Sequence, residues 1–493
     1  MDYLFYDLYA ITSEIYILWG ASILLIYGVF FSSSLTLGFP ILNKSISLIS
    51  LQVFLLGLLL VLFQEQINLV SWNNLLILNN FNYSAKIIIF EFSIFWIFLS
   101  YQYSFQNKIN PFEFWVLILL AILAMLFVIQ SNDLLSIYLA IEFQSLIFYI
   151  LASFNRTSEF STEAGLKYFI LGAFSSALLL FGSSLLYGLT GLTNLNDLAN
   201  LFTGFAIKDF STTIGIVTGI IFIISALFFK ISASPFHMWA PDVYEGANII
   251  VTALFSILPK LPIFSILIKL LFFSFHDLID YWLILVVVST LFSLMVGALG
   301  AFTQTKWKRF MAYSSINHVG FMLIALITGS KEGVFSIIVY ILIYMITVLG
   351  TFSFIMSLRY YSYPKIQQSR YLVNLKMLSV TNSLLAGAIT IFLFSMAGIP
   401  PLAGFFSKWF ILVTAVKNNV IGISIIAVLV NCIACFYYIR LIKNMYFDYQ
   451  NNWPVLVPAT KSNSLVLGGS LIILLFLIAD LELILTIATF MTL

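Results

Sequence analysis

Apolar stretches of about 20 residues recur along almost the whole chain, and they constrain its fold more than any other feature. A helix needs roughly 20 such residues to cross a bilayer, whereas strands of a membrane barrel are about ten residues long and alternate in polarity. Of the 493 residues, 62% are hydrophobic and only 9% are charged, which is outside the range of soluble domains. The sequence therefore predicts an all-α polytopic membrane protein.

The apolar stretches define about 14 expected membrane spans. They lie near 15–36, 46–64, 83–104, 111–130, 133–153, 165–190, 211–245, 248–272, 280–302, 308–328, 333–358, 378–417, 418–445 and 464–488. No long hydrophilic segment separates them, so we expect a single transmembrane domain over residues 1–493.

Basic residues in the loops between spans indicate the orientation in the membrane, because they are retained on its negative side. Only Lys208, Lys331 and Lys417 follow even-numbered spans. The larger set follows odd-numbered spans and comprises Lys44, Lys108, Arg156, Lys306, Lys308, Arg309, Arg359, Lys365, Arg370, Lys376, Arg440, Lys443 and Lys461. We expect the odd-numbered loops on the negative side and both termini on the other.

Two expected spans are interrupted by proline-containing segments, "SASPFHMWAP" in span 7 and "MAGIPPLAGF" in span 12. Non-helical backbone at membrane depth is tolerated only where protein or a wet cavity surrounds it. Because the two breaks stand an odd number of spans apart, the broken helices cross in opposite directions, as in inverted repeats. We predict two inverted five-helix repeats, about 111–272 and 280–445, flanked by helices in 1–110 and 446–493.

Four ionisable residues fall deep within the expected spans: Glu142, Lys230, Lys260 and Lys408. A charge at the bilayer centre costs about 2.5–3.5 kcal/mol on insertion scales, so such residues usually mark ion or proton pathways. The functional interpretation is a proton relay in which a carboxylate and an amine set each other's proton affinity. The structural alternative is a set of buried ion pairs that fix helix register.

Three further residues form a supporting polar path in this interpretation: His237 in the first break, His318 in span 10 and Lys167 at the start of span 6. A packing role suits either histidine equally well. Lys86 and Lys269 lie near span ends, where snorkelling to the interface would explain them, and Lys167 could do the same. The end of the first half of span 7 should also place partial negative charge near Lys230.

Motifs for redox cofactors, metals and nucleic acids are not evident in the sequence. Cys432 and Cys435 are too few for an iron–sulfur cluster, and no glycine-rich nucleotide loop occurs. The formal net charge is only +2, without a basic stripe, which argues against a nucleic-acid partner. We therefore expect no cofactor and no metal in this chain.

Five segments resemble a known family: "STEAGLKYFILGAFSSALLLFG", "FKISASPFHMWAPDVYEGA", "KWKRFMAYSSINHVGF", "GIPPLAGFFSKWFIL" and "CFYYIRLIK". They are similar to the antiporter-like membrane-arm subunits of respiratory complex I, NADH:ubiquinone oxidoreductase, and among them to the mitochondrially encoded subunit 2 family, whose bacterial homologue is the N subunit. The resemblance runs from about residue 110 to 450. One departure is "ANIIVTALF" at the start of span 8, which is commonly proline-containing in the family.

The resemblance implies that Glu142, Lys230, Lys260 and Lys408 carry protons, driven by quinone reduction elsewhere in the complex. NAD, FMN, iron–sulfur clusters and ubiquinone would belong to other subunits. Expected partners are other membrane-arm subunits, including a neighbouring antiporter-like subunit, and lipids. The acidic residues outside the family's pathway, Glu91, Asp480 and Glu482, are expected to meet a partner subunit or lipid headgroups.

The location follows from composition and from the resemblance. The N-terminal "MDYLFYDLYAITSE" is acidic, unlike a signal or transit peptide, and 50 Phe with 11 Pro indicates an AT-rich gene. We expect a multi-pass protein of the mitochondrial inner membrane, encoded in the mitochondrion. Two other classes stay open: a subunit of a multisubunit cation/proton antiporter, and a non-transporting assembly subunit whose buried charges are remnants.

Overall fold

The computed structural model describes residues 2–32, 41–106, 111–203, 210–362, 365–449 and 455–492. Within these residues, 13 helical segments are long and apolar enough to cross a membrane, which confirms the predicted all-α polytopic class. They are α2 (Thr12–Ser32), α3 (Ile41–Leu62), α4 (Asn80–Gln106), α5 (Glu113–Gln130), α6 (Leu134–Ala152), α7 (Glu159–Thr190), α9 (Phe210–Ile231), the segment Ile249–Ser274, α13 (Ile279–Thr303), α14 (Trp307–Ile327), α15 (Lys331–Ser357), α19 (Ile421–Tyr446) and α20 (Lys461–Ala479).

The expected span that is not among these 13 segments is span 12, the second broken one. It consists of α17 (Ser383–Ala397) and α18 (Ala403–Lys417), each too short to cross a bilayer alone. The first break separates α9 from α10 (Trp239–Gly246). Both predicted interruptions are therefore present, whereas the inverted-repeat pattern stays a prediction.

Two expected spans are less continuous than predicted. The segment Ile249–Ser274 is divided into α11 (Ile249–Ile257), α12 (Lys260–Ile268) and a π-helical turn, η1 (Lys269–Ser274), with Pro259 between α11 and α12. The span expected near 464–488 is present but shorter, because α20 ends at Ala479 and a separate helix, α21 (Glu482–Thr492), follows. The Asp480 carboxylate accepts a hydrogen bond from the Glu482 amide at 2.7 Å, so it begins the new helix as a cap.

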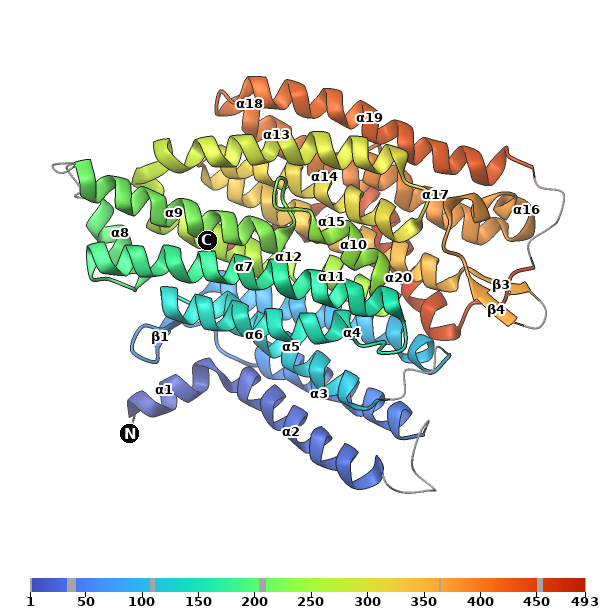
Figure 1. Cartoon of the computed structure of the whole chain (residues 1–493), viewed down its shortest axis with the longest axis horizontal. Coiled ribbons are helices and arrows are strands. Elements are labelled where there is room, and N and C mark those ends of the chain that lie inside the picture. The colour runs from blue at the N-terminus through green and yellow to red at the C-terminus, as the bar shows by residue number, and fades with distance from the viewer. Residues whose placement is uncertain are drawn as a thin grey trace. The chain divides into compact units, whose positions relative to one another are not determined.

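The chain divides into two compact units. The first comprises the described parts of Met1–Ile231, Leu258–Leu285 and Thr489–Leu493. Within it α7 packs along α9, while α5 lies against α6, and α6 against α7 (Figure 1). The short helix α1 (Asp2–Ala10) precedes α2, the hairpin β1 (Leu69–Ser71)–β2 (Leu76–Leu78) joins α3 to α4, and α8 (Leu195–Thr203) lies between α7 and α9.

The second unit comprises Ser232–Ile257 and Val286–Ala488, in its described parts. Its centre is formed by α14 and α15, whose most apolar windows are 94% and 83% buried. Helix α15 contacts α11, α14, α17, α18 and α20. The hairpin β3 (Arg359–Ser362)–β4 (Lys365–Gln368) follows α15, and α16 (Leu378–Thr381) precedes α17.

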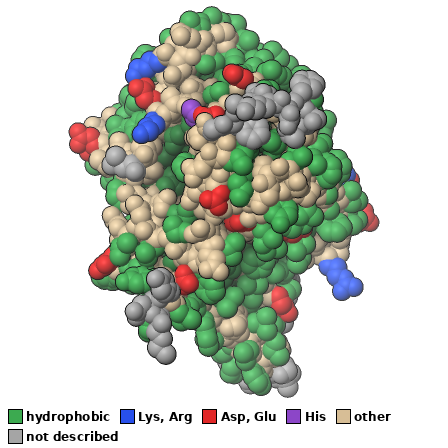
Figure 2. All heavy atoms as spheres, turned by 90° about the vertical axis from the view of Figure 1, so that its left-hand side faces the viewer, with side chains coloured by type: hydrophobic (Ala, Val, Ile, Leu, Met, Phe, Trp, Pro, Cys, Tyr) green, Lys and Arg blue, Asp and Glu red, His purple; other side chains and the backbone are tan. Residues whose placement is uncertain are grey.

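The exterior is largely apolar, as expected for a chain that meets lipid or other subunits. Hydrophobic side chains cover much of the face in Figure 2, with charged side chains scattered among them. The orientation predicted from loop charges stays a prediction, and two of its residues, Lys108 and Lys208, lie outside the described residues.

Candidate functional site

Lys230 lies in the last turn of α9, in the first unit, and its amine is buried. The Nζ atom has no hydrogen-bond partner within the described part of the chain and lies 5.9 Å from the centre of the Tyr149 ring on α6. A cation at this distance from an aromatic face is attracted by its quadrupole. The helix-end charge expected to act on Lys230 is not realised as a hydrogen bond, because its Nζ reaches no terminal carbonyl of α9.

Glu142 lies two turns before Tyr149 on α6 and is partly exposed. Its carboxylate accepts a hydrogen bond from Ser145 Oγ at 3.2 Å, and it acts electrostatically on Lys230. The hydroxyl of Tyr149 is buried without a partner in the described residues, like Lys230 Nζ. Gly172 on α7 makes room for this hydroxyl, since a Cβ there would clash with Tyr149 Oη. Unsatisfied buried polar atoms are rare in native structures and often mark functional sites.

Lys260 is the first residue of α12 and is only 4% exposed. Helix α12 packs against α9, which carries Lys230, and against α5, which adjoins α6. In the first unit α9 and α12, which carry Lys230 and Lys260, contact each other, and Lys230 lies against Tyr149 of α6, the helix that also carries Glu142.

Lys408 lies in α18 of the second unit, just after the second break, and is 4% exposed. Its Nζ donates hydrogen bonds to the carbonyl oxygens of Met396 at 2.9 Å and Ala397 at 2.8 Å, and to Asn431 Oδ1 at 2.6 Å. The two carbonyls belong to the last turn of α17, where the helix dipole is negative. Lys408 of α18 thus caps the C-terminal end of α17, the first half of the broken span.

Gly398 permits this closure. It ends α17 in the left-handed region, with φ +81°, and a Cβ there would lie 2.8 Å from Lys408 Cδ and 3.2 Å from Nζ. Cys435 on α19 shares the site, because its Sγ donates to Ala397 O at 3.4 Å.

His318 occupies the buried centre of α14, between two tyrosines. Its Nδ1 lies 2.7 Å from Tyr340 Oη on α15, and its Nε2 lies 3.4 Å from Tyr438 Oη on α19. One turn further along α14, the Phe321 ring centre lies 5.2 Å from Lys408 Nζ. Lys408 therefore contacts α14 one turn away from His318. Hydroxyl and imidazole groups hydrogen-bonded in a chain, as Tyr340, His318 and Tyr438 are, can pass protons.

The other two supporting residues differ in their surroundings. His237 lies in the first break, 8% exposed, and its Nδ1 has no hydrogen-bond partner in the described residues. Lys167 forms an i,i+4 ion pair with Glu163 at 2.8 Å on an outer face of α7, with its side chain 44% exposed. Lys167 thus lies half exposed on α7, whereas the Lys230 amine is buried on α9.

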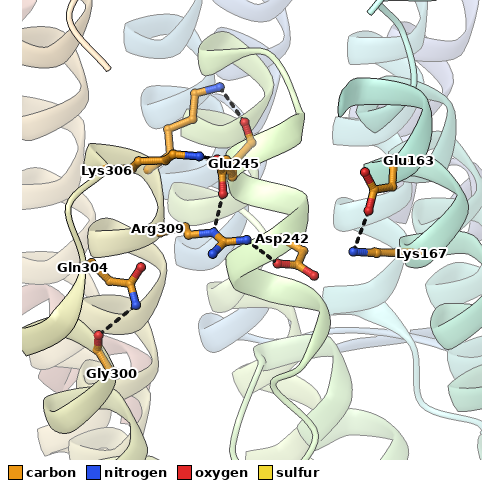
Figure 3. A network of polar contacts seen from close by, with 9 residues as sticks. Glu163, Lys167, Asp242, Glu245, Gly300, Gln304, Lys306 and Arg309 are labelled. Atoms are coloured by element: carbon orange, nitrogen blue, oxygen red, sulfur yellow. Dashed lines mark hydrogen bonds and ion pairs between the residues drawn. The ribbon is translucent and has the colours of Figure 1, made fainter. Parts of the chain in front are cut away.

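A network of charges that sequence reasoning did not assign joins α10 to the start of α14 (Figure 3). Arg309 donates to Asp242 at 2.9 Å and pairs with Glu245, and Lys306 pairs with Glu245 as well. The available signal was the spacing of three between the two acids after the break, together with the basic cluster "KWKR". The network fixes the second piece of the broken span to α14.

Two lysines near the span ends of the first unit, Lys86 and Lys269, also have partners within the chain that the sequence did not reveal. Lys86 and Glu14, both side chains 0% exposed, form an ion pair at 2.8 Å between α4 and α2. Lys269 donates to Ile129 O and, at 3.2 Å, to Ser131 O at the end of α5. The snorkelling expected for Lys86 is wrong, because α2 covers its amine, whereas the half-buried Lys269 leaves that expectation untested.

A helical membrane chain with two interrupted helices, each beside a buried lysine, belongs to the class of antiporter-like membrane proteins. Residues 131–434 match the family described as NADH:quinone oxidoreductase/Mrp antiporter, transmembrane. The chain is 43% identical to NADH-ubiquinone oxidoreductase chain 2 of Marchantia polymorpha, over 96% of this chain and 95% of the relative. It is 38% identical to NADH-quinone oxidoreductase subunit N of Paramagnetospirillum magneticum, over 95% of this chain and 94% of the relative. The chain belongs to this NADH:quinone oxidoreductase/Mrp antiporter family, with chain 2 and subunit N proteins as its relatives.

Solved structures share the fold. A chain of respiratory complex I from Thermus thermophilus matches with a TM-score of 0.77 and 23% identity, covering 96% of this chain and 98% of that one. A chain of the Mrp complex from Dietzia sp. matches with a TM-score of 0.76 and 19% identity, covering 98% and 97%. At these identities the likeness concerns the fold alone.

Proposed function

We propose that this chain is a membrane-arm subunit of NADH:ubiquinone oxidoreductase that moves protons across the inner mitochondrial membrane. The relatives named chain 2 and subunit N, and the antiporter-like fold, support membership of such a complex. In this proposal the protons pass along Glu142, Lys230, Lys260 and Lys408, driven by quinone reduction in another part of the complex. NAD, FMN, iron–sulfur clusters and ubiquinone bind other subunits, and the chain is encoded in the mitochondrion.

The observation that carries the proposal is the buried Lys230 amine, which has no hydrogen-bond partner in the described residues. A register-fixing ion pair would hold the amine against a carboxylate, but no ion pair within 4.0 Å joins Lys230 to Glu142 among the described residues. Two unit charges about 6 Å apart interact by roughly 3 kcal/mol at an effective dielectric of about 20. Moving Glu142 and Lys230 from this separation to far apart would change the proton affinity of either group by up to about two pKa units, which would load or release a proton.

Lys408 has a different task in this mechanism. Its ammonium is held by three oxygen acceptors, so it stays protonated until its contacts with the end of α17 loosen. Movement of α18 against α17 couples a conformational change to proton release at this position. The break allows that movement because no continuous backbone hydrogen bonding joins the two half-helices.

A double-mutant cycle on Glu142 and Lys230 tests the proposal. Glu142→Gln and Lys230→Ala should each slow coupled quinone reduction and proton pumping, and the double change should cost much less than the sum. For contacting charges the interaction energy should be about 0.5–3 kcal/mol. The measurement is NADH-driven proton uptake in a genetically tractable member of the family, after normal assembly has been verified.

The matched control is the exposed pair Glu332–Lys417, 2.9 Å apart with side chains 58% and 59% exposed. Its cycle should give an interaction near zero in the pumping assay. Strictly additive losses at Glu142 and Lys230 would show that these residues do not communicate, and the switching mechanism would then be abandoned.

A second function, cation/proton antiport, is favoured by the Mrp part of the family description and by the likeness to a chain of an Mrp complex. The two functions differ in what drives transport. Proton movement that requires NADH oxidation and is insensitive to a sodium gradient supports the first, whereas sodium-driven proton movement without NADH supports the second.

A further inference from the structure

Helix α4 carries one uncovered stripe along its length. About 78% of its most apolar window is buried, yet partly or fully exposed residues recur every three or four positions on one side. The stripe comprises Ile87, Glu91, Phe95, Phe98, Gln102 and Phe105. Such spacing places these residues on a single face of the helix. The described residues of the first unit therefore leave this face of α4 open.

Glu91 lies near the middle of that stripe. It is the twelfth residue of a 27-residue helix, ~17 Å from one end and ~22 Å from the other at 1.5 Å per residue. Its carboxylate forms no hydrogen bond or ion pair within the described part of the chain. An unpaired carboxylate at the bilayer centre lowers the partition coefficient of a helix from water into the membrane by on the order of a hundredfold.

The unit contains a cation close to Glu91 in sequence, but that cation is already engaged. Lys86, five residues earlier on α4, is fully buried against Glu14 at 2.8 Å. Acyl chains cannot compensate a carboxylate, since they offer no donor. The cavity of about 390 Å³ beside α4 lies at its far end, lined by Asn43, Lys44 and Gln106 among others, and Glu91 does not line it.

We propose that a transmembrane helix of another subunit packs along the exposed stripe of α4 and presents a lysine or arginine to Glu91. The ion pair is formed at the centre of an otherwise apolar contact made by Phe95 and Phe98. This surface serves assembly and does not depend on the proton path proposed for Glu142 and Lys230. Its failure and the failure of that path are therefore separable.

Dicyclohexylcarbodiimide tests the proposal on the native complex, because this apolar reagent modifies carboxyl groups exposed to lipid within a membrane. The peptide containing Glu91 is quantified by mass spectrometry in the intact complex and again after the subunits are separated in detergent. We expect Glu91 to be protected in the intact complex and modified after separation. Glu14 is the internal control, since its pair with Lys86 lies within this chain and should protect it throughout.

Two outcomes overturn the proposal. Modification of Glu91 in the intact complex would show that it faces lipid. Protection both before and after separation would show that this chain itself covers it.

Substitutions give a second, independent measurement in a tractable relative that has a glutamate at this position. Glu91→Leu should weaken retention of the neighbouring subunit by about tenfold or more, the size expected for losing a charged hydrogen bond. Phe95→Leu, one turn away on the same stripe, should have little effect. Protons pumped per electron should be unchanged in complexes that keep the partner. Equal retention with Glu91→Leu and Phe95→Leu would refute the paired cation.

Discussion

Replacing Gly398 by alanine should detach Lys408 from the end of α17. The new Cβ would lie 2.8 Å from Lys408 Cδ, whereas carbon atoms in contact are about 3.5–4.0 Å apart, so the lysine must shift by roughly 0.7 Å or more. A non-glycine residue at φ +81° also costs about 1–2 kcal/mol. Losing one charge-assisted hydrogen bond of Lys408 adds about 1.5–3 kcal/mol. Gly398→Ala should therefore lower the free energy of unfolding by about 3–5 kcal/mol in total.

The assay compares Gly398→Ala with Gly387→Ala, a change in the same helix where an added Cβ meets nothing within 4 Å. Thermal stability of the purified complex and NADH-driven proton uptake are measured for both variants. Gly398→Ala should lower both quantities, whereas Gly387→Ala should leave pumping intact and stabilise α17 by up to about 1 kcal/mol. If the two variants behave alike, Lys408 is not held by the last turn of α17.

Two further predictions concern the ion pair in the first unit and the orientation in the membrane. Lys86→Met should destabilise the complex by about 3–5 kcal/mol because it leaves Glu14 buried and unpaired, and adding Glu14→Gln should restore most of the loss in a thermal unfolding measurement. Cysteines placed at Lys306 and at Ser330, on opposite ends of α14, should be labelled from opposite sides of intact inner-membrane vesicles, Lys306 from the matrix side; labelling of position 306 from the intermembrane side would reverse the predicted orientation.

The spans were predictable because a run of about 20 apolar residues has few alternatives in a membrane. The interruption between α20 and α21 could not be predicted in this way. Asp480 lies in a segment whose average hydrophobicity is still that of a single span. Its effect depends on a local cap formed with the Glu482 amide. Averages over a window cannot detect a single capping side chain.

At the candidate site, too, the sequence predicts which residues matter but not their contacts. The sequence predicts that Lys230 and Lys408 are functional, but it does not predict that Lys408 is hydrogen-bonded to the end of a helix. Side chains on a helix lean toward its N-terminus. Lys230, in the last turn of α9, therefore leans away from the terminal carbonyls of its own helix, whereas Lys408, near the start of α18, leans back toward the end of α17. The partner of a buried charge depends on this direction as well as on its position in the sequence.

The positions of Lys86 and Lys269 near span ends were likewise not enough to predict what their amines contact. Snorkelling requires an end that faces water or headgroups, and sequence position does not say whether another helix covers it. Glu14 on α2 pairs with Lys86, and the carbonyls of Ile129 and Ser131 accept hydrogen bonds from Lys269. These are contacts between residues more than 70 positions apart, which no local pattern encodes.

The pair formed by Glu14 and Lys86 also imposes an order on biogenesis. At about 5–20 residues per second, a ribosome completes Lys86 roughly 4–14 s after Glu14. During that interval α2 contains an apolar segment with a carboxylate whose counter-charge does not yet exist. We therefore expect helix α2 to enter the bilayer either with Glu14 protonated or together with α4, the helix that carries the counter-charge.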